Sequence, residues 1–182
     1  SPYLERFTES KERAESMLEE LNTASNTATL LPSEMRKELT EKKKSVERLY
    51  NAGLLRYESG DINQAIELMQ QAMHYIDSNM QSFNKKAFGL MDSLSESIEK
   101  NYFQALDLNA SNKLIEFKRE KMLSLKEEAS RIISKGNISK AVEKISEFIE
   151  CSTDLNAILH EAIIKAKAKT TPKTENKYAT GI

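Results

Sequence analysis

The chain has no tryptophan and holds few of the residues that usually separate strands and tight turns. Its 182 residues include one cysteine, five glycines and three prolines. Sheets joined by tight turns need more glycine, proline and β-branched residues than this, so the composition favours a helical protein. The lone Cys151 cannot form an internal disulfide, and the sequence carries no sign of an oxidising compartment.

Strong net charge and long apolar runs are also missing. The formal net charge is −1, so no global field attracts nucleic acid or an anionic membrane. No apolar run approaches the roughly 20 residues that span a bilayer. The first five residues lack the basic and then apolar pattern of a signal peptide. We therefore expect a cytoplasmic protein.

The residues that would carry catalysis are sparse. The five glycines are scattered singly, which argues against a phosphate-binding loop. His74 and His160 are the only histidines, and neither belongs to a ligand motif such as H-E-x-x-H. We predict no catalytic, cofactor-binding or metal-binding residues, and hence a protein that is not an enzyme. An enzyme of unfamiliar type that uses His74 or His160 is the alternative.

An internal repeat is the clearest feature that is present. Residues 60–67 (GDINQAIE) return as residues 136–143 (GNISKAVE), an offset of 76 residues (136 − 60). The same offset pairs Phe7 with Phe83, and it pairs Met69 with Ile145. It also relates Leu4 to Met80, Tyr57 to Ile133, Val46 to Met122 and Met73 to Ile149. A repeat of this kind predicts a duplicated structural unit.

Apolar residues recur at steps of three and four, which is the spacing of an amphipathic helix. Gly60 and Gly136 are each followed by Asp or Asn, a stop and N-cap signal that predicts a sharp reversal between helices. The polar stretch from Thr23 to Pro32 predicts a loop. The expected helices cover about 3–22, 33–59, 61–108, 111–135 and 138–168. A break near residues 77–79 is the alternative to an unbroken helix over 61–108.

These patterns predict an all-α, elongated helical bundle with long coiled-coil-like helices and an internal duplication. We place the first helical unit at residues 1–78 and the second at 79–169, in one continuous bundle that shares the long helix over 61–108. Residues 170–182 contain little apolar material and are expected to form a tail.

Residues 53–73 carry small and aromatic residues at spacings that resemble the tetratricopeptide helical hairpin. The positions are Gly53, Tyr57, Gly60, Asp61, Ala65 and Ala72. Residues 129–149 repeat part of this pattern, with Ala129, Gly136 and Ala141, but Phe148 replaces the last alanine. Tetratricopeptide units follow one another about every 34 residues. We interpret the likeness as a similar local hairpin in which a small residue at 65 and 141 lets two helices approach closely.

The most consistent hypothesis is a non-catalytic scaffold, adaptor or structural subunit that binds another protein or itself. Long apolar seams on few helices often leave part of a stripe uncovered, which favours association. The candidate contact residues are Tyr50, Tyr57, Met73 and Met80. The alternative is a membrane-surface or nucleic-acid contact through the basic end at Lys165, Lys167 and Lys169, although packing of this helix on the bundle is favoured.

Overall fold

The computed structural model describes residues 1–170, and the described residues contain helices and no strand. The all-α prediction is therefore confirmed. The helices in chain order are α1 (Pro2–Thr27), the 3-10 helix η1 (Ala28–Leu30), α2 (Ser33–Glu58), α3 (Ile62–Asn79), α4 (Gln81–Asp107), α5 (Lys113–Lys135) and α6 (Ile138–Ala168).

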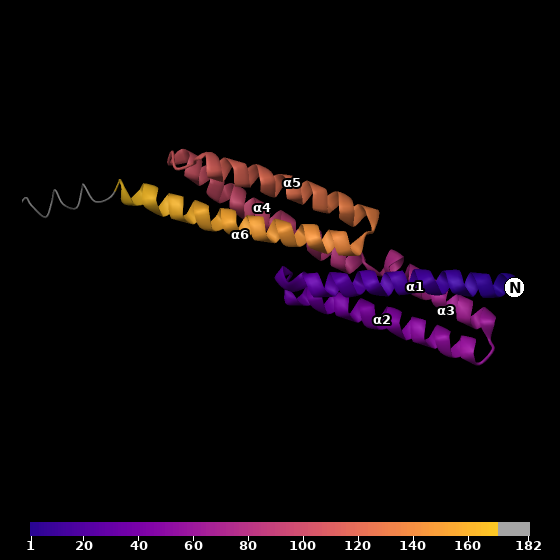
Figure 1. The fold of residues 1–182 in the computed structure, drawn as a ribbon. Helices are drawn as coiled ribbons and strands as arrows, with labels where there is room; N and C mark the ends of the chain where they lie inside the picture. Colours follow the sequence, from indigo (N-terminus) through magenta and orange to yellow (C-terminus); the bar gives the residue numbers. More distant parts are fainter. Residues whose placement is uncertain (171–182) are drawn as a thin grey trace, which may run out of the picture.

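The helices form two antiparallel three-helix units that lie end to end (Figure 1). Unit 1 consists of α1, α2 and α3, and unit 2 consists of α4, α5 and α6. The chain begins at the free end of unit 1, and α6 ends at the opposite end of the rod (Figure 1). The two units meet where the end of α1, η1 and the start of α2 contact the starts of α4 and α6. The buried apolar side chains of both units form one cluster that continues across this joint.

The duplication is visible in the burial pattern. The buried residues of α3 are Ala65, Ile66, Met69, Ala72 and Ile76, and the residues 76 positions later in α6 are all buried too. In the second helix of each unit, Leu39, Val46 and Gly53 match Ile115, Met122 and Ala129 at the same offset. The predicted duplication is therefore confirmed.

The first predicted loop is shorter than expected. α1 runs to Thr27, and η1 follows directly, so residues 23–30 of the expected loop are helical. Ala24 and Ala28 are fully buried, and this burial favours the helix despite the polar composition around them. The Thr27 hydroxyl donates to the carbonyl of Thr23 at 2.9 Å, so the polar side chain bonds within its own helix.

The helix predicted over 61–108 is interrupted at a single residue. Met80 has φ −105° and ψ 3° and separates α3 from α4. The Asn79 side-chain amide donates to the carbonyl of Tyr75 at 2.6 Å, and it thereby competes for an acceptor of the helical ladder. The prediction of an unbroken helix was wrong, and the break lies one residue beyond the 77–79 alternative.

The two Gly-Asx turns form as predicted. Gly60 and Gly136 have φ of +87° and +77°, a left-handed conformation that glycine adopts without steric penalty. Asp61 accepts a hydrogen bond from the backbone N–H of Gln64, and Asn137 accepts one from that of Lys140. Asn112 caps α5 in the same way, so this helix begins at Lys113 and not at 111. The expected tail over 170–182 lies, apart from Thr170, outside the described residues.

Candidate functional site

The two candidate tyrosines lie on α2 and face α1. The Tyr50 hydroxyl donates to a carboxylate oxygen of Glu15 at 3.1 Å. Burial, and then the hydrogen bond and charge of Glu15, raise the pKa of Tyr50. The Tyr57 ring stacks on Phe7 with 4.2 Å between ring centroids and 1° between ring planes. Both side chains therefore hold α2 against α1, and Tyr57 still leaves 40 % of its surface exposed.

The two candidate methionines lie elsewhere. Met73 on α3 is half-buried against the core, whereas Met80 is buried at the break between α3 and α4. The structure thus does not gather the four residues into one surface. It places Tyr57 at the free end of unit 1 and Met80 inside the joint between the units.

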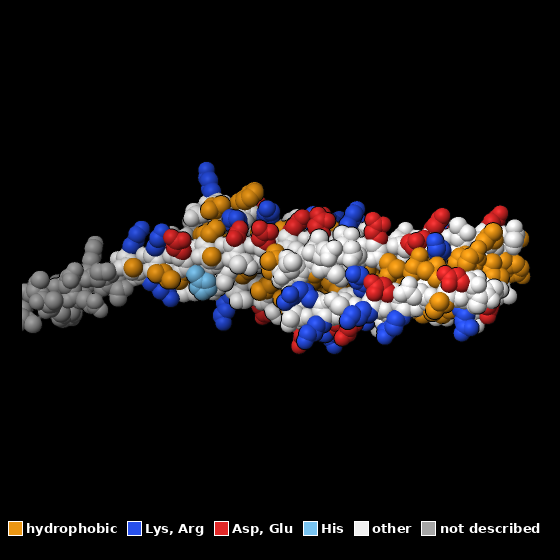
Figure 2. All heavy atoms as spheres, turned by 60° about the horizontal axis from the view of Figure 1, so that its bottom comes forward, with side chains coloured by type: hydrophobic (Ala, Val, Ile, Leu, Met, Phe, Trp, Pro, Cys, Tyr) orange, Lys and Arg blue, Asp and Glu red, His pale blue; other side chains and the backbone are white. Residues whose placement is uncertain are grey.

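Exposed apolar side chains gather at the free end of unit 1, which we call the tip. Its members are Tyr3 and Leu4 at the start of α1, and Leu55 and Tyr57 at the end of α2. Figure 2 shows hydrophobic side chains over this end of the rod. The sequence reasoning missed Tyr3, Leu4 and Leu55. The repeat could have drawn attention to Leu4, because it pairs Leu4 with Met80 at the offset of 76 residues. Two such equivalent apolar residues need not be buried to the same extent, and here Leu4 is exposed whereas Met80 is buried.

A second set of exposed apolar residues lies toward the opposite end of the rod, which we call the far end. Phe103 and Leu106 belong to the end of α4, Leu114 and Phe117 to the start of α5, and Ile164 to the end of α6. Arg119 lies 4.3 Å over the Tyr102 ring, and its Nε donates to Glu99 at 2.9 Å. The Glu99 hydrogen bond raises the pKa of Arg119 despite partial burial.

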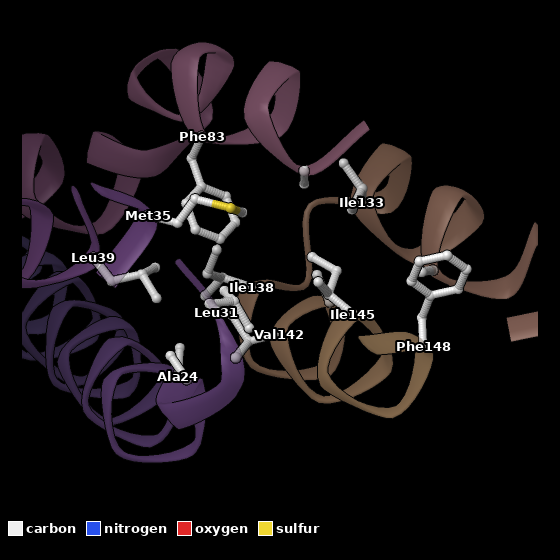
Figure 3. Packing of buried hydrophobic residues seen from close by; sticks show 14 of the residues in the cluster. Ala24, Leu31, Met35, Leu39, Phe83, Ile133, Ile138, Val142, Ile145 and Phe148 are labelled. Carbon is white, nitrogen blue, oxygen red and sulfur yellow. The ribbon is translucent and has the colours of Figure 1, made fainter. Parts of the chain in front are cut away.

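The joint combines an apolar core with a polar tie. Ile138 and Val142 of α6 lie beside Leu31 and Ala24 of unit 1, and Phe83 of α4 lies beside Met35 (Figure 3).

The polar tie of the joint is built around Glu38 of α2. One carboxylate oxygen accepts hydrogen bonds from Ser82, at 2.8 Å, and from Lys86. Burial alone raises the pKa of Glu38, but the hydrogen bonds from Lys86 and Ser82 and the charges of Lys86 and Lys42 outweigh it, so the pKa lies below the ordinary value. The other carboxylate oxygen of Glu38 is buried and accepts no hydrogen bond within the described residues. The polar tie therefore uses only one of the two oxygens.

The basic end carries its lysines on the last turns of α6. Lys165 pairs with Glu161 at 2.9 Å, and this hydrogen bond lowers the pKa of the Glu161 carboxyl. Lys165 and Lys169 border an open groove of about 580 Å³ between α6 and the α4–α5 loop. Lys167 lies exposed in the same last turn. Because a carboxylate already partners Lys165, the local positive charge is smaller than the row of lysines suggests.

The groups considered for catalysis lie apart. His74 Nδ1 contacts the Asp77 carboxylate at 3.0 Å on an exposed helix face, and His160 is exposed on α6. Cys151 is buried, which raises the pKa of its thiol. Within residues 1–170, no group of three or more His, Cys, Asp or Glu side chains could hold a metal ion. No helix in that range is long and apolar enough to cross a membrane.

Comparison with protein-family models, with curated proteins and with solved structures gave no match. The likeness to the tetratricopeptide hairpin therefore stays a prediction.

Proposed function

We propose that this chain is a non-catalytic helical scaffold or adaptor subunit that binds another protein, or itself, through the tip. The observation that supports the proposal is the distribution of exposed apolar side chains. Ten large hydrophobic residues are exposed in the described chain, and all except Leu30 lie toward the two ends of the rod. Clustered exposed apolar side chains are typical of binding surfaces, whereas scattered ones are ordinary.

The shape supports the same function. The helices α3 and α4 together run most of the length of the rod, roughly 70 Å at 1.5 Å per residue. A rod with apolar ends and a charged flank can hold two partners apart, or can extend an assembly along its axis. The tip is the better defined of the two ends, because the Phe7–Tyr57 stack fixes the surface that it presents.

The test compares matched leucine variants of the whole chain. Leu4→Glu with Leu55→Glu places charge on the tip, and Leu30→Glu places charge at a leucine of similar exposure, 48 % against 44 % for Leu4, away from the tip. Light scattering after size exclusion measures self-association, and quantitative cross-linking in an extract measures proteins bound to each variant. We expect the tip variant to lose the association and the Leu30 variant to keep it. Equal binding by both variants contradicts the proposal.

A further inference from the structure

The far end carries an apolar face that is shared by α4 and α5. Its four residues, here called the α4–α5 face, are between 39 % and 64 % exposed: Phe103, Leu106, Leu114 and Phe117. Each helix contributes two residues that are three positions apart and therefore lie on one side of that helix. Arg119 of α5 reaches across to α4, where its guanidinium lies over the Tyr102 ring and 5.9 Å from the centroid of the Phe103 ring. The two helices thus present these residues in one neighbourhood.

The fold does not require apolar side chains at this face. Leu114 and Phe117 stand 76 residues after Glu38 and Glu41, in the second helix of each unit. Glu41 is exposed, as Phe117 is, so this position of the three-helix unit accepts a charged side chain. A phenylalanine that is 64 % exposed there contributes little to the core of unit 2. Such a residue, grouped with others of its kind, indicates a contact outside the unit.

The tip and the α4–α5 face match in composition and size. Each consists of two aromatic residues and two leucines, and the four side chains of the tip are between 40 % and 65 % exposed. Since a buried aromatic side chain covers about 150–250 Å², each face offers roughly 300–400 Å² of apolar surface. A standard interface buries about 800 Å² on each partner, of which somewhat more than half is apolar. One face against the other, with a polar rim, therefore approaches the size of a specific interface.

Both faces are bordered by charge of both signs. Arg56 and Glu58 flank Tyr57 at the tip, and Asp107 and Lys113 border the α4–α5 loop. The four charged side chains are exposed, and within residues 1–170 none of them forms an ion pair. Each face can therefore offer both a cation and an anion to the rim of the other. Such rim charges favour a defined orientation more than they add affinity.

We propose that the α4–α5 face of one copy of this chain binds the tip of a second copy, so that the rods join head to tail. The inference rests on the proposed function and names the partner of the tip. The two faces lie at opposite ends of the rod (Figure 1). A dimer formed through two tips, or through two α4–α5 faces, leaves the other face of every copy uncovered. The head-to-tail contact uses both faces and repeats along the axis of the rod.

The experiment uses two variants of the whole chain, each of which retains one of the two faces. The tip variant, Leu4→Glu with Leu55→Glu, retains the α4–α5 face. The far-end variant, Phe103→Glu with Phe117→Glu, retains the tip. Sedimentation velocity over a range of protein concentrations measures the mass of each variant alone, of their equimolar mixture and of the unmodified chain.

A second far-end variant and a matched control complete the set. Because Phe103 lies near Arg119, Leu114→Glu with Phe117→Glu provides a far-end variant that changes α5 alone. Leu30→Glu is the control, because it places charge on an exposed leucine that belongs to neither face. Far-UV circular dichroism and a cooperative melt establish that each variant is folded.

We expect the average mass of the unmodified chain, and of the Leu30 control, to rise with concentration beyond that of a dimer, because every docked copy still carries a free face. Each face variant alone should associate at least tenfold more weakly and sediment as a monomer. The equimolar mixture should form a one-to-one complex that grows no further, because its two intact faces pair once. Dimers of the tip variant alone, dimers of a far-end variant alone, or a folded mixture that stays monomeric would each overturn the inference.

Failure of this inference is distinguishable from failure of the scaffold proposal. If the unmodified chain stays monomeric while the tip variant loses a cross-linked protein that the Leu30 control keeps, the scaffold proposal stands and the head-to-tail contact is wrong. If the tip variant and the Leu30 control match the unmodified chain in both measurements, both proposals fail.

Discussion

The two units share a pattern of burial but differ in what surrounds it. In α3 and α6 every buried position of the shorter helix is matched at an offset of 76. In α1 and α4 the offset becomes 77 after Phe7, because Ser10, Ala14 and Leu21 match Ala87, Met91 and Ile98 (87 − 10). The step from Phe7 to Ser10 is three residues and the step from Phe83 to Ala87 is four. Both steps return to the same face of a helix, so the core position is preserved while the alignment is not.

The polar tie of the joint has no counterpart at the far end. Glu38 bonds to Ser82 and Lys86, but the residues 76 positions later are Leu114, Ile158 and Ala162. The joint thus uses a hydrogen-bonded carboxylate where the far end has aliphatic side chains. The two units therefore share their interiors, while the surfaces where the units meet or end differ.

Alanine substitutions at the two equivalent phenylalanines are expected to have the largest effects on stability. Phe83 is fully buried within the joint, whereas Phe7 lies under the partly exposed ring of Tyr57. Phe83→Ala should lower the free energy of unfolding by about 3–5 kcal/mol, because it leaves a cavity that neither unit can fill. Phe7→Ala should lower it by roughly 1–2 kcal/mol less, because Tyr57 can move into the space. Urea unfolding of both variants measures the difference.

Equal losses at the two phenylalanines would show that the tip is as tightly packed as the joint. Phe83→Leu and Phe7→Leu serve as controls, because leucine keeps most of the apolar volume. Each should lower the free energy of unfolding by less than the alanine substitution at the same position.

The two glycine turns should respond alike. Gly60 and Gly136 both have positive φ, and a Cβ added to either meets no atom within 4 Å. Gly60→Ala and Gly136→Ala should therefore each lower stability by about 1 kcal/mol through backbone strain alone. Thermal unfolding measures both. A clearly larger loss at Gly136 would mean that the nearby joint constrains the turn, which contradicts a purely local origin.

Acid should weaken the joint through Glu38. Because the pKa of Glu38 lies below its ordinary value of 4.5, the ionised carboxylate stabilises the folded chain above that pH. This contribution is lost as pH falls through the lower folded-state pKa. The unmodified chain should therefore be more stable than Glu38→Gln at pH 7, and the gap should narrow below about pH 4.

Urea midpoints of the two proteins between pH 3 and 7 measure this gap. Lys86→Met provides the matched control, because it removes a donor to the same carboxylate. In a chain that carries Lys86→Met, the loss of stability caused by Glu38→Gln at pH 7 should be smaller than in the unmodified chain. A gap that is constant with pH would show that ionised Glu38 does not stabilise the joint.

The smallest expected effect lies at Gly53, which stands where unit 2 has Ala129. A Cβ at Gly53 would come within 2.9 Å of Met69 Cε, the mobile end of a flexible side chain. The gain in helix propensity, about 1 kcal/mol, should be largely offset by the shift of Met69. Gly53→Ala should thus change stability by less than about 0.5 kcal/mol. Adding Met69→Ile, which reproduces the Ala129–Ile145 pair of unit 2, shows by thermal melting whether the two cores are interchangeable.

Much of the fold was predictable because helical periodicity and turn chemistry are local. The bounds of α6 agree with the expected 138–168 range, and Gly60, Asp61, Gly136 and Asn137 act as expected. The loop expected over residues 23–32 was mispredicted because the burial of Ala24 and Ala28 is a tertiary effect. The interruption at Met80 adjoins the hydrogen bond from the Asn79 side-chain amide to the Tyr75 carbonyl, and such a bond leaves no trace in the apolar periodicity.

The candidate contacts were predictable only in part. The sequence pointed to Tyr57 as an aromatic residue at the end of a helix, and that residue lies at the tip. It could not separate Leu4 from Met80, since both are apolar residues at the same position of a repeated unit. Leu4 lies at the free end of unit 1 and Met80 at the break between α3 and α4, so the fold and not the local sequence sets their different exposure.

The amino-acid sequence by itself determined that the chain is helical, duplicated and reversed at two glycines, because these properties follow from spacing, capping and backbone freedom. Only the tertiary structure decided which apolar faces are buried. Burial depends on the neighbours that each face meets, and two copies of one pattern at different places along a rod meet different neighbours. Leu4 and Tyr57 at the exposed tip, and Met80 and Ile133 in unit 2, are equivalent positions in those two situations.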